Sequence, residues 1–280
     1  MRKATLLLVL LACLLAAGRE GASTPHLFPA RVGLVLIAAT ADGFALAADG
    51  SSLNADGRVS QEQRLFQLGK RGALTIVGTV SIQDPVGSRV REEVNIARIA
   101  GAWLAAHPEA DVTTASRDVN AAIAAALNKF LSTRNVGTDE SGFKFAVIAA
   151  GFGQDKPVLI TTRYFMPGVK GKPARAEQTA IAPQPGELWI MGNSSVPEEI
   201  LSGKTSMLKT FKDEPAVKKF RSAPKPDLGG QDYINLFDSI LRAAESDQAK
   251  KLDGRRTIVA PPNKFAVVTK DGFTWSTMPN

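Results

Sequence analysis

The sequence contains very little cysteine and histidine. Of its 280 residues, one is cysteine and two are histidine. A structural zinc site needs about four Cys or His ligands, so the sequence excludes a zinc cluster, and we predict neither a metal nor another cofactor. A Ser-His-Asp relay would have to use His26 or His107 as its base. We expect His26 in a polar linker and His107 at the end of a helix.

The rest of the composition is ordinary. Hydrophobic residues make up 44% of the chain and charged residues 22%, with 24 Gly and 16 Pro. These fractions are typical of a globular domain and argue against disorder, collagen and coiled coil. The formal net charge is +7, which by itself indicates no particular partner.

The first 22 residues have the features of an export signal. Arg2 and Lys3 precede an apolar run over 6–17, and small residues follow at 16–18. The run is too short to form a stable membrane-spanning helix. We therefore predict a periplasmic or secreted protein, cut after Gly18 or after Ala22. Either cut removes Arg2 and Lys3, which lowers the net charge from +7 to +5.

Cys13 lies inside this apolar run and offers an alternative. The preceding Leu10-Leu11-Ala12 resembles a bacterial lipobox, which would make Cys13 a lipid anchor. The apolar run continues beyond Cys13 through 14–17, which favours a cleaved signal instead. The mature chain would then contain no cysteine and depend on its core without disulfides.

Strand patterns recur along the mature chain. Residues 32–39 and 143–150 are almost uniformly apolar, as in strands buried on both faces. Turn signals such as Asp42-Gly43 predict hairpins between neighbouring strands. The expected strands are 32–39, 44–48, 64–68, 74–77, 143–150, 158–165, 187–191, 257–260, 265–269 and 273–275, with a loop or hairpin over 49–63.

Helical periodicity appears in consecutive segments. The apolar residues 90, 94, 97, 101 and 104 share one helical face, as do 119, 123, 127 and 130. A short helix is expected over 197–202 and an amphipathic one over 233–244. Residues 166–186 hold four prolines and are expected to form a long mobile excursion.

Residues 204–225 form a basic stretch, with seven Lys or Arg against Asp213 and Glu214. Such a stretch can contact nucleic acid or anionic lipid. Regular aromatic interleaving is absent and export is expected, so we predict a solvated helical segment and no nucleic-acid partner.

The order of the elements favours an α+β fold. Hairpin connections imply antiparallel sheets, and paired helices argue against a doubly wound parallel sheet. Two antiparallel sheets packed face to face, with helices outside each, would bury both faces of both sheets. We expect a four-layer αββα sandwich over 32–280, after the signal (1–22) and a leader or linker (23–31).

Several segments, in order, resemble the proteasome subunit family and its N-terminal-nucleophile hydrolase relatives. They are Asp42-Gly43-Phe44-Ala45-Leu46-Ala47-Ala48-Asp49, Arg64-Leu65-Phe66-Gln67-Leu68, Gly78 before a helix pair, the strand pair 143–165, Gly192-Asn193-Ser194-Ser195, and the closing hairpin at 267–273. The resemblance covers about residues 32–276. It implies the αββα sandwich and, in catalytic members, a mature N-terminal Thr whose amino group serves as base.

The resemblance implies candidate site residues. Asp49 stands for the family's acidic residue, Arg64 for its Lys, and Asn193 for the Ser after Gly in the turn. Arg keeps the charge of Lys but does not readily release a proton. No Thr, Ser or Cys begins the first strand, where Arg31, Val32 and Gly33 stand. Ser23 or Thr24 would therefore have to become the mature N-terminus.

Each candidate also has a structural interpretation. Asp49 can be a turn residue, Arg64 an exposed strand residue, and Ser23 and Thr24 part of a polar linker. Asn193, with Ser194 and Ser195, can cap the following helix instead of stabilising an oxyanion. Thr40 ends the first strand and would be exposed only by cutting a buried run.

Two functions remain open at this point. The first is an amide or peptide hydrolase with an N-terminal Ser or Thr. The second is a non-catalytic assembly or binding module of the same fold. The corresponding partners are a peptide or amide substrate in the first case and other copies of the chain in the second.

Overall fold

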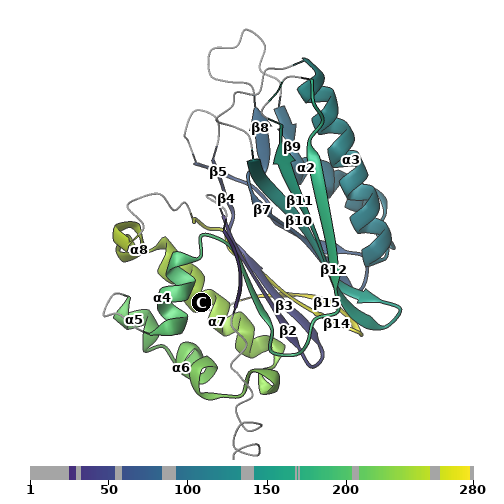
Figure 1. Cartoon of the computed structure of the whole chain (residues 1–280). Coiled ribbons are helices and arrows are strands. Elements are labelled where there is room, and N and C mark those ends of the chain that lie inside the picture. Colours follow the sequence, from purple (N-terminus) through teal and green to yellow (C-terminus); the bar gives the residue numbers. More distant parts are fainter. Residues whose placement is uncertain are drawn as a thin grey trace, which may run out of the picture.

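A computed structural model describes residues 25–29, 33–53, 59–83, 93–133, 142–167, 169, 171–203, 208–252 and 259–277. Two large sheets lie face to face, and helices lie on the outer side of each (Figure 1). The predicted signal over 1–22, with Ser23 and Thr24, falls outside the described residues.

The first sheet has six strands in the order β1-β13-β2-β3-β14-β15. Neighbouring strands are antiparallel except that β1 pairs with β13 in parallel. The strands are β1 (His26–Pro29), β2 (Leu34–Thr40), β3 (Gly43–Ala48), β13 (Leu188–Gly192), β14 (Lys264–Thr269) and β15 (Gly272–Ser276). As predicted, β2 is buried along its whole length.

The second sheet has five antiparallel strands in the order β12-β11-β10-β7-β6. They are β6 (Leu65–Leu68), β7 (Gly72–Gly78), β10 (Gly142–Gly153), β11 (Lys156–Met166) and β12 (Arg175–Ile181). Two short ribbons accompany the sheets: β4 (Ser51–Leu53) with β5 (Val59–Gln61), and β8 (Ser81–Gln83) with β9 (Glu93–Asn95).

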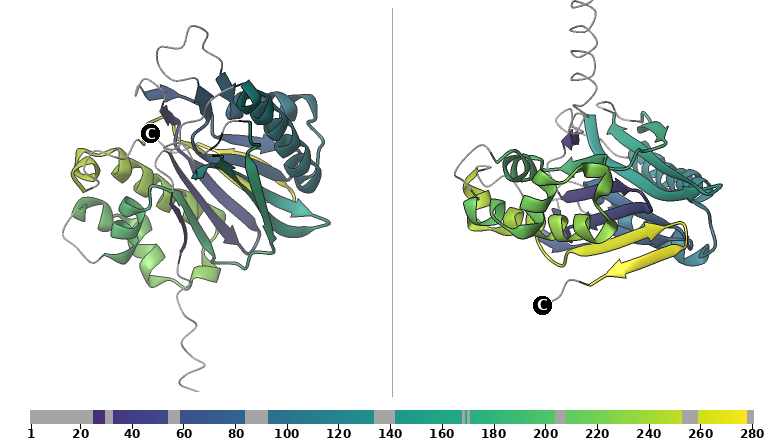
Figure 2. Two further views of the ribbon diagram at one scale, coloured as in Figure 1. Left: turned by 45° about the horizontal axis from the view of Figure 1, so that its top comes forward. Right: turned by 90° about the horizontal axis from the view of Figure 1, so that it is seen from below.

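The helices form two groups on opposite sides of the sheets, as the views in Figures 1 and 2 show. Helices α2 (Ile96–Ala106) and α3 (Val112–Thr133) pack on the second sheet. The first sheet is covered by helices from the C-terminal half. These are α4 (Ser195–Ser202), α5 (Lys209–Lys212), α6 (Pro215–Ser222), α7 (Gly230–Glu245) and α8 (Asp247–Leu252), with a 3₁₀ turn at Lys225–Asp227.

Side-chain alternation distributes the buried residues among three hydrophobic clusters. In β2, Val35 and Ile37 face the layer between the sheets, whereas Leu34 and Leu36 face the helices of the first sheet. The third cluster lies between the second sheet and helices α2 and α3. Because successive strand residues point to opposite faces, uniformly apolar strands are what two covered faces require. The predicted α+β class with antiparallel sheets is confirmed.

Several predicted segments differ from the structure. The predicted leader over 23–31 contains strand β1, whose His26 stacks on Trp189 with ring centroids 5.2 Å apart. The predicted excursion over 166–186 contains the edge strand β12. Residues 259–260 lie outside any strand, while 257–258 fall outside the described residues. Both β1 and β12 lie at sheet edges, and β12 is mostly exposed, so its sequence carries little apolar pattern.

The basic stretch is less solvated than predicted. Val217 and Phe220 of α6 are buried, and so is Lys212, which pairs with Glu199. Lys218 and Lys219 also pair with acidic residues, Asp213 and Asp232 respectively. Three of the seven basic residues of the stretch thus have acidic partners within the helical layer. The absence of a nucleic-acid partner stays a prediction.

The buried hydroxyl of Thr75, in β7, is expected to lower the free energy of unfolding of the protein. This hydroxyl is buried and has no hydrogen-bond partner among the described residues. Thr75 lies between Ala73 and Val77 on the face toward the other sheet. An unsatisfied buried hydroxyl costs about 1–3 kcal/mol. Thr75→Val, which keeps the shape, should raise the free energy of unfolding by about 1 kcal/mol, measured by urea denaturation.

Thr162→Val is the matched control for this substitution. Thr162 is equally buried on a strand, but its Oγ1 accepts a hydrogen bond from Gln178 at 3.2 Å. Its replacement should lower stability by about 1 kcal/mol. If both variants shift in the same direction, the unpaired hydroxyl of Thr75 is not the cause.

Candidate functional site

Asp49 follows β3 and is completely buried. Its Oδ1 accepts a hydrogen bond from the backbone N–H of Leu34 at 2.8 Å. Its Oδ2 accepts one from the backbone N–H of Ser51 at 3.2 Å and another from the Ser51 hydroxyl. The carboxylate therefore holds the start of β2 against the end of β3.

Arg64 directly precedes β6, and its side chain is also completely buried. Its Nε donates to the carbonyl oxygen of Ser51 at 2.7 Å, and Nη2 donates to the same oxygen. Its Nη1 donates to the carbonyl oxygens of Ile76 at 3.2 Å and Gly78 at 2.8 Å. One guanidinium thus connects the end of β7 in the second sheet to the segment that leaves the first sheet.

Asp49 and Arg64 form a buried ion pair, with Arg64 Nε 3.6 Å from Asp49 Oδ1. Burial raises the pKa of Asp49, an effect opposed by the charge of Arg64 and by the hydrogen bonds from Ser51 and Leu34. Burial lowers the pKa of Arg64, which the charge of Asp49 opposes. The pair is consistent with a structural clamp, because its hydrogen bonds go to the backbone and to Ser51.

Gly33 lies directly against this pair. Its φ is +80°, and a Cβ added to it would lie 2.7 Å from Cζ of Arg64. Its carbonyl oxygen accepts a hydrogen bond from the backbone N–H of Asn193 at 3.3 Å. Three of the sequence-predicted residues, Asp49, Arg64 and Asn193, therefore meet around Gly33. From the sequence alone, Gly33 stands at the start of the first predicted strand without a predicted role.

Asn193 uses its side chain within its own turn. Its Oδ1 accepts hydrogen bonds from the backbone N–H of Ser195 at 3.0 Å and from the Ser195 hydroxyl at 2.5 Å. Helix α4 begins at Ser195, two residues earlier than the predicted start at 197. Asn193 thus closes a local turn before α4, whereas the N-cap residue is Ser194, whose side chain makes no capping hydrogen bond. The capping role of Asn193 stays a prediction.

Among the remaining candidates, the described residues Thr40 and His107 lie elsewhere in the structure. Ser23 and Thr24 fall outside the described residues. Thr40 ends β2 at the end opposite to Gly33. His107 ends α2, as predicted, where its Nδ1 lies 2.8 Å from the carbonyl oxygen of Trp103.

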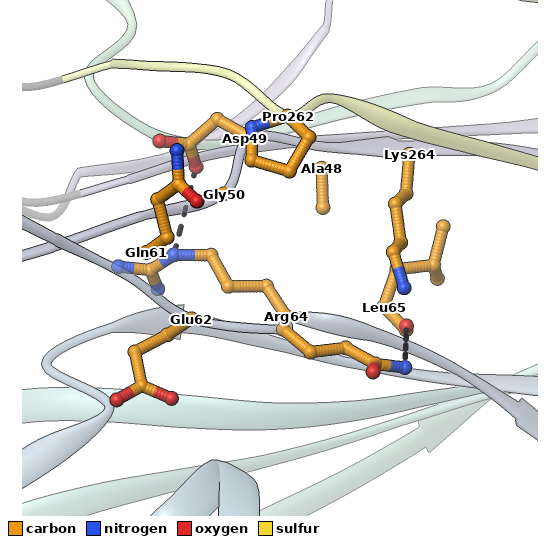
Figure 3. A pocket seen from close by; sticks show the side chains of 10 residues that line it. Ala48, Asp49, Gly50, Gln61, Glu62, Arg64, Leu65, Pro262 and Lys264 are labelled. Carbon is orange, nitrogen blue, oxygen red and sulfur yellow. Dashed lines mark hydrogen bonds and ion pairs between the residues drawn. The ribbon is translucent and has the colours of Figure 1, made fainter.

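A cavity of about 180 Å³ opens beside the ion pair. Figure 3 shows it between Pro262 and Ala48 on one side and the aliphatic part of Arg64 on the other, with Lys264 along its edge. Lys264 is not among the candidate residues predicted from the sequence. A lysine at the first position of an alternating strand is a common surface residue, so its sequence context carries no signal.

Two acidic residues, Asp49 and Glu62, are among the residues that line this cavity. Glu245, whose pKa is raised by burial, accepts a hydrogen bond from Asn263 Nδ2 at 2.7 Å. Within the described part of the chain, no cluster of three or more His, Cys, Asp or Glu could hold a metal ion. The same residues include no helix that is long and apolar enough to cross a membrane.

No protein-family model matches the chain, and neither does any curated protein. The similar solved structures include Anbu from Hyphomicrobium sp. strain MC1, at 12% identity over 87% of this chain and 85% of that chain, with a TM-score of 0.49. Anbu (ancestral beta-subunit) from Yersinia bercovieri has 12% identity, 86% coverage of each chain and a TM-score of 0.46. The helical assembly of the Anbu complex from Pseudomonas aeruginosa has 12% identity, 88% coverage of each chain and a TM-score of 0.48.

These comparisons correct the family expected from the sequence. The chain matches no family model, and the solved structures similar to it are Anbu proteins at 12% identity with TM-scores below 0.5. Likeness at that level establishes neither a shared fold nor a shared activity. The prediction that the chain is a divergent proteasome subunit-like or N-terminal-nucleophile hydrolase is therefore wrong as a family assignment.

Proposed function

We propose that this chain is an exported, non-catalytic binding or assembly module built as a four-layer αββα sandwich. The observation that carries the proposal is the complete burial of the Asp49–Arg64 pair, whose hydrogen bonds go to backbone groups and to Ser51. A group that acts on a substrate must reach it with a free donor, acceptor or lone pair. The bonding of this pair favours a structural role instead.

The residues around the pair support the same proposal. Gly33 adjoins the guanidinium and has no side chain that could attack a carbonyl. Arg64 keeps its proton at any ordinary pH, so it is a poor substitute for a lysine that exchanges one. Export is supported by the charged start, the apolar run and the small residues within 1–22.

Covalent labelling of the exported full-length protein tests the proposal against the hydrolase alternative. The mature N-terminus is determined by mass spectrometry, and the protein is then treated with a hydroxyl-directed β-lactone. We expect no acyl adduct and no cleavage of a peptide amide panel. A stoichiometric adduct on an N-terminal Ser23 or Thr24, absent in the corresponding Ser23→Ala or Thr24→Ala variant, would establish the hydrolase and overturn the proposal.

A further inference from the structure

The cavity beside Arg64 is large enough for a small organic molecule. Its volume of about 180 Å³ exceeds the ~150 Å³ of an engineered cavity that binds benzene. Ala48, Leu65 and Pro262 contribute apolar surface to its lining. Its size and walls therefore suit a compact apolar body of about six or seven carbon atoms.

The register of β14 directs Lys264 toward this cavity. Ala266 and Val268 belong to the cluster between the two sheets, whereas Phe265 belongs to the cluster under the helices. Lys264 shares the face of Ala266 because side chains alternate along a strand. Its partner in register on β3 is Ala48, whose small side chain leaves space in front of the ammonium.

Lys264 has no carboxylate partner among the residues that the structure describes. Its Nζ lies 5.3 Å from the ring centroid of Trp275, a cation–π contact with a partly exposed ring. Such a contact stabilises the ammonium but does not neutralise its charge. The cation is therefore available to an anion from solution.

The two acidic residues that line the cavity are engaged elsewhere. Asp49 is paired with Arg64 and accepts hydrogen bonds from Leu34 and Ser51. Glu62 accepts a hydrogen bond from Asn95 Nδ2 at 3.2 Å, and Figure 3 shows its carboxylate on the far side of Arg64 from Lys264 and Pro262. Among the described charged residues that line the cavity, the Lys264 ammonium is thus the group without an internal counterion.

From this geometry we infer that the cavity binds a small monocarboxylic acid, with its carboxylate on Lys264 and its apolar body between Ala48, Leu65 and Pro262. This inference rests on the proposed function, because it treats the chain as a module that binds a ligand without converting it. The ammonium–carboxylate hydrogen bond supplies orientation, and the apolar walls supply most of the contact area.

Benzoate is the probe, titrated into the full-length exported protein by isothermal titration calorimetry. We expect saturable binding with a Kd of about 1 mM or tighter. Lys264→Met, which keeps the side-chain length and loses the charge, should weaken benzoate binding about tenfold or more. Benzamide, the neutral analogue, should bind the wild-type protein about tenfold more weakly than benzoate.

Lys270→Met is the matched control, because Lys270 lies in the exposed turn of the same β14–β15 hairpin. It should bind benzoate as the wild type does. Lys264→Arg keeps a charge at the cavity and should bind within a few-fold of wild type, which guards against a folding defect in the methionine variant. Near-UV circular dichroism checks that each variant is folded.

Two results would overturn the inference. One is the absence of benzoate binding to wild-type protein up to about 50 mM, and the other is equal binding by wild type and a folded Lys264→Met. Neither result bears on the acyl-adduct experiment, which tests the hydrolase alternative by itself.

Discussion

Replacing Arg64 with methionine is expected to lower the free energy of unfolding by about 3–5 kcal/mol. The substitution leaves the Asp49 carboxylate buried without its counter-charge, and four hydrogen bonds to the carbonyl oxygens of Ser51, Ile76 and Gly78 are lost. Breaking one side of a buried pair costs far more than the pair contributes, since the remaining charge stays desolvated. Urea denaturation followed by circular dichroism measures the loss.

Arg71→Met is the control for this prediction. Arg71 also pairs with an aspartate, Asp155, but their side chains are 39% and 80% exposed. Exposed pairs contribute about 0–1 kcal/mol, so this variant should remain within about 1 kcal/mol of wild type. Equal losses for the two arginines would contradict the assignment of Asp49 and Arg64 as the buried clamp.

Gly33→Ala is expected to destabilise the protein by about 2–4 kcal/mol. The backbone at Gly33 has a φ of +80°, which L-residues adopt only with strain. The new Cβ would also lie 2.7 Å from Cζ of Arg64, so the guanidinium would have to leave its carbonyl partners. The midpoint and slope of urea denaturation measure the effect.

Gly171→Ala separates the two causes of that loss. Gly171 has a similar φ of +73°, but no atom of the described part of the chain lies within 4 Å of an added Cβ. The strain alone should cost about 1 kcal/mol. A loss at position 33 no larger than at position 171 would show that the contact with Arg64 is unimportant.

The sequence alone predicted most of the fold. Apolar runs such as those in β2 and β10 require burial on both faces, and the Asp42-Gly43 turn requires a hairpin. The main strands and the α2–α3 pair follow from such local patterns. The edge strand β12 is mostly exposed and has no strong apolar pattern that would predict it. The edge strand β1 has only four residues, follows Pro25 and ends at Pro29, and such prolines are typical of a linker.

The site was only partly predictable. A family resemblance that the comparisons do not uphold predicts Asp49, Arg64 and Asn193 as site residues, and all three lie around Gly33. Asp49 and Arg64 bond to backbone groups of Leu34, Ser51, Ile76 and Gly78. Every residue type has these backbone groups, so the sequence does not show which residues will be the partners. Lys264 went unnoticed for a related reason, since its position depends on the register of β14 against β3.

The scarcity of cysteine and histidine, the apolar leader and the alternating or uniformly apolar strands are properties of the chain itself. They argue against a zinc cluster of Cys and His and indicate that the fold depends on a hydrophobic core. Tertiary structure decided the state of Asp49 and Arg64. Asp49 and Arg64 are 15 residues apart in sequence, and this spacing does not predict an ion pair. The pair forms because both side chains are buried where the two sheets meet. Burial removes the water that would compete for their hydrogen bonds, and backbone groups from both sheets take its place.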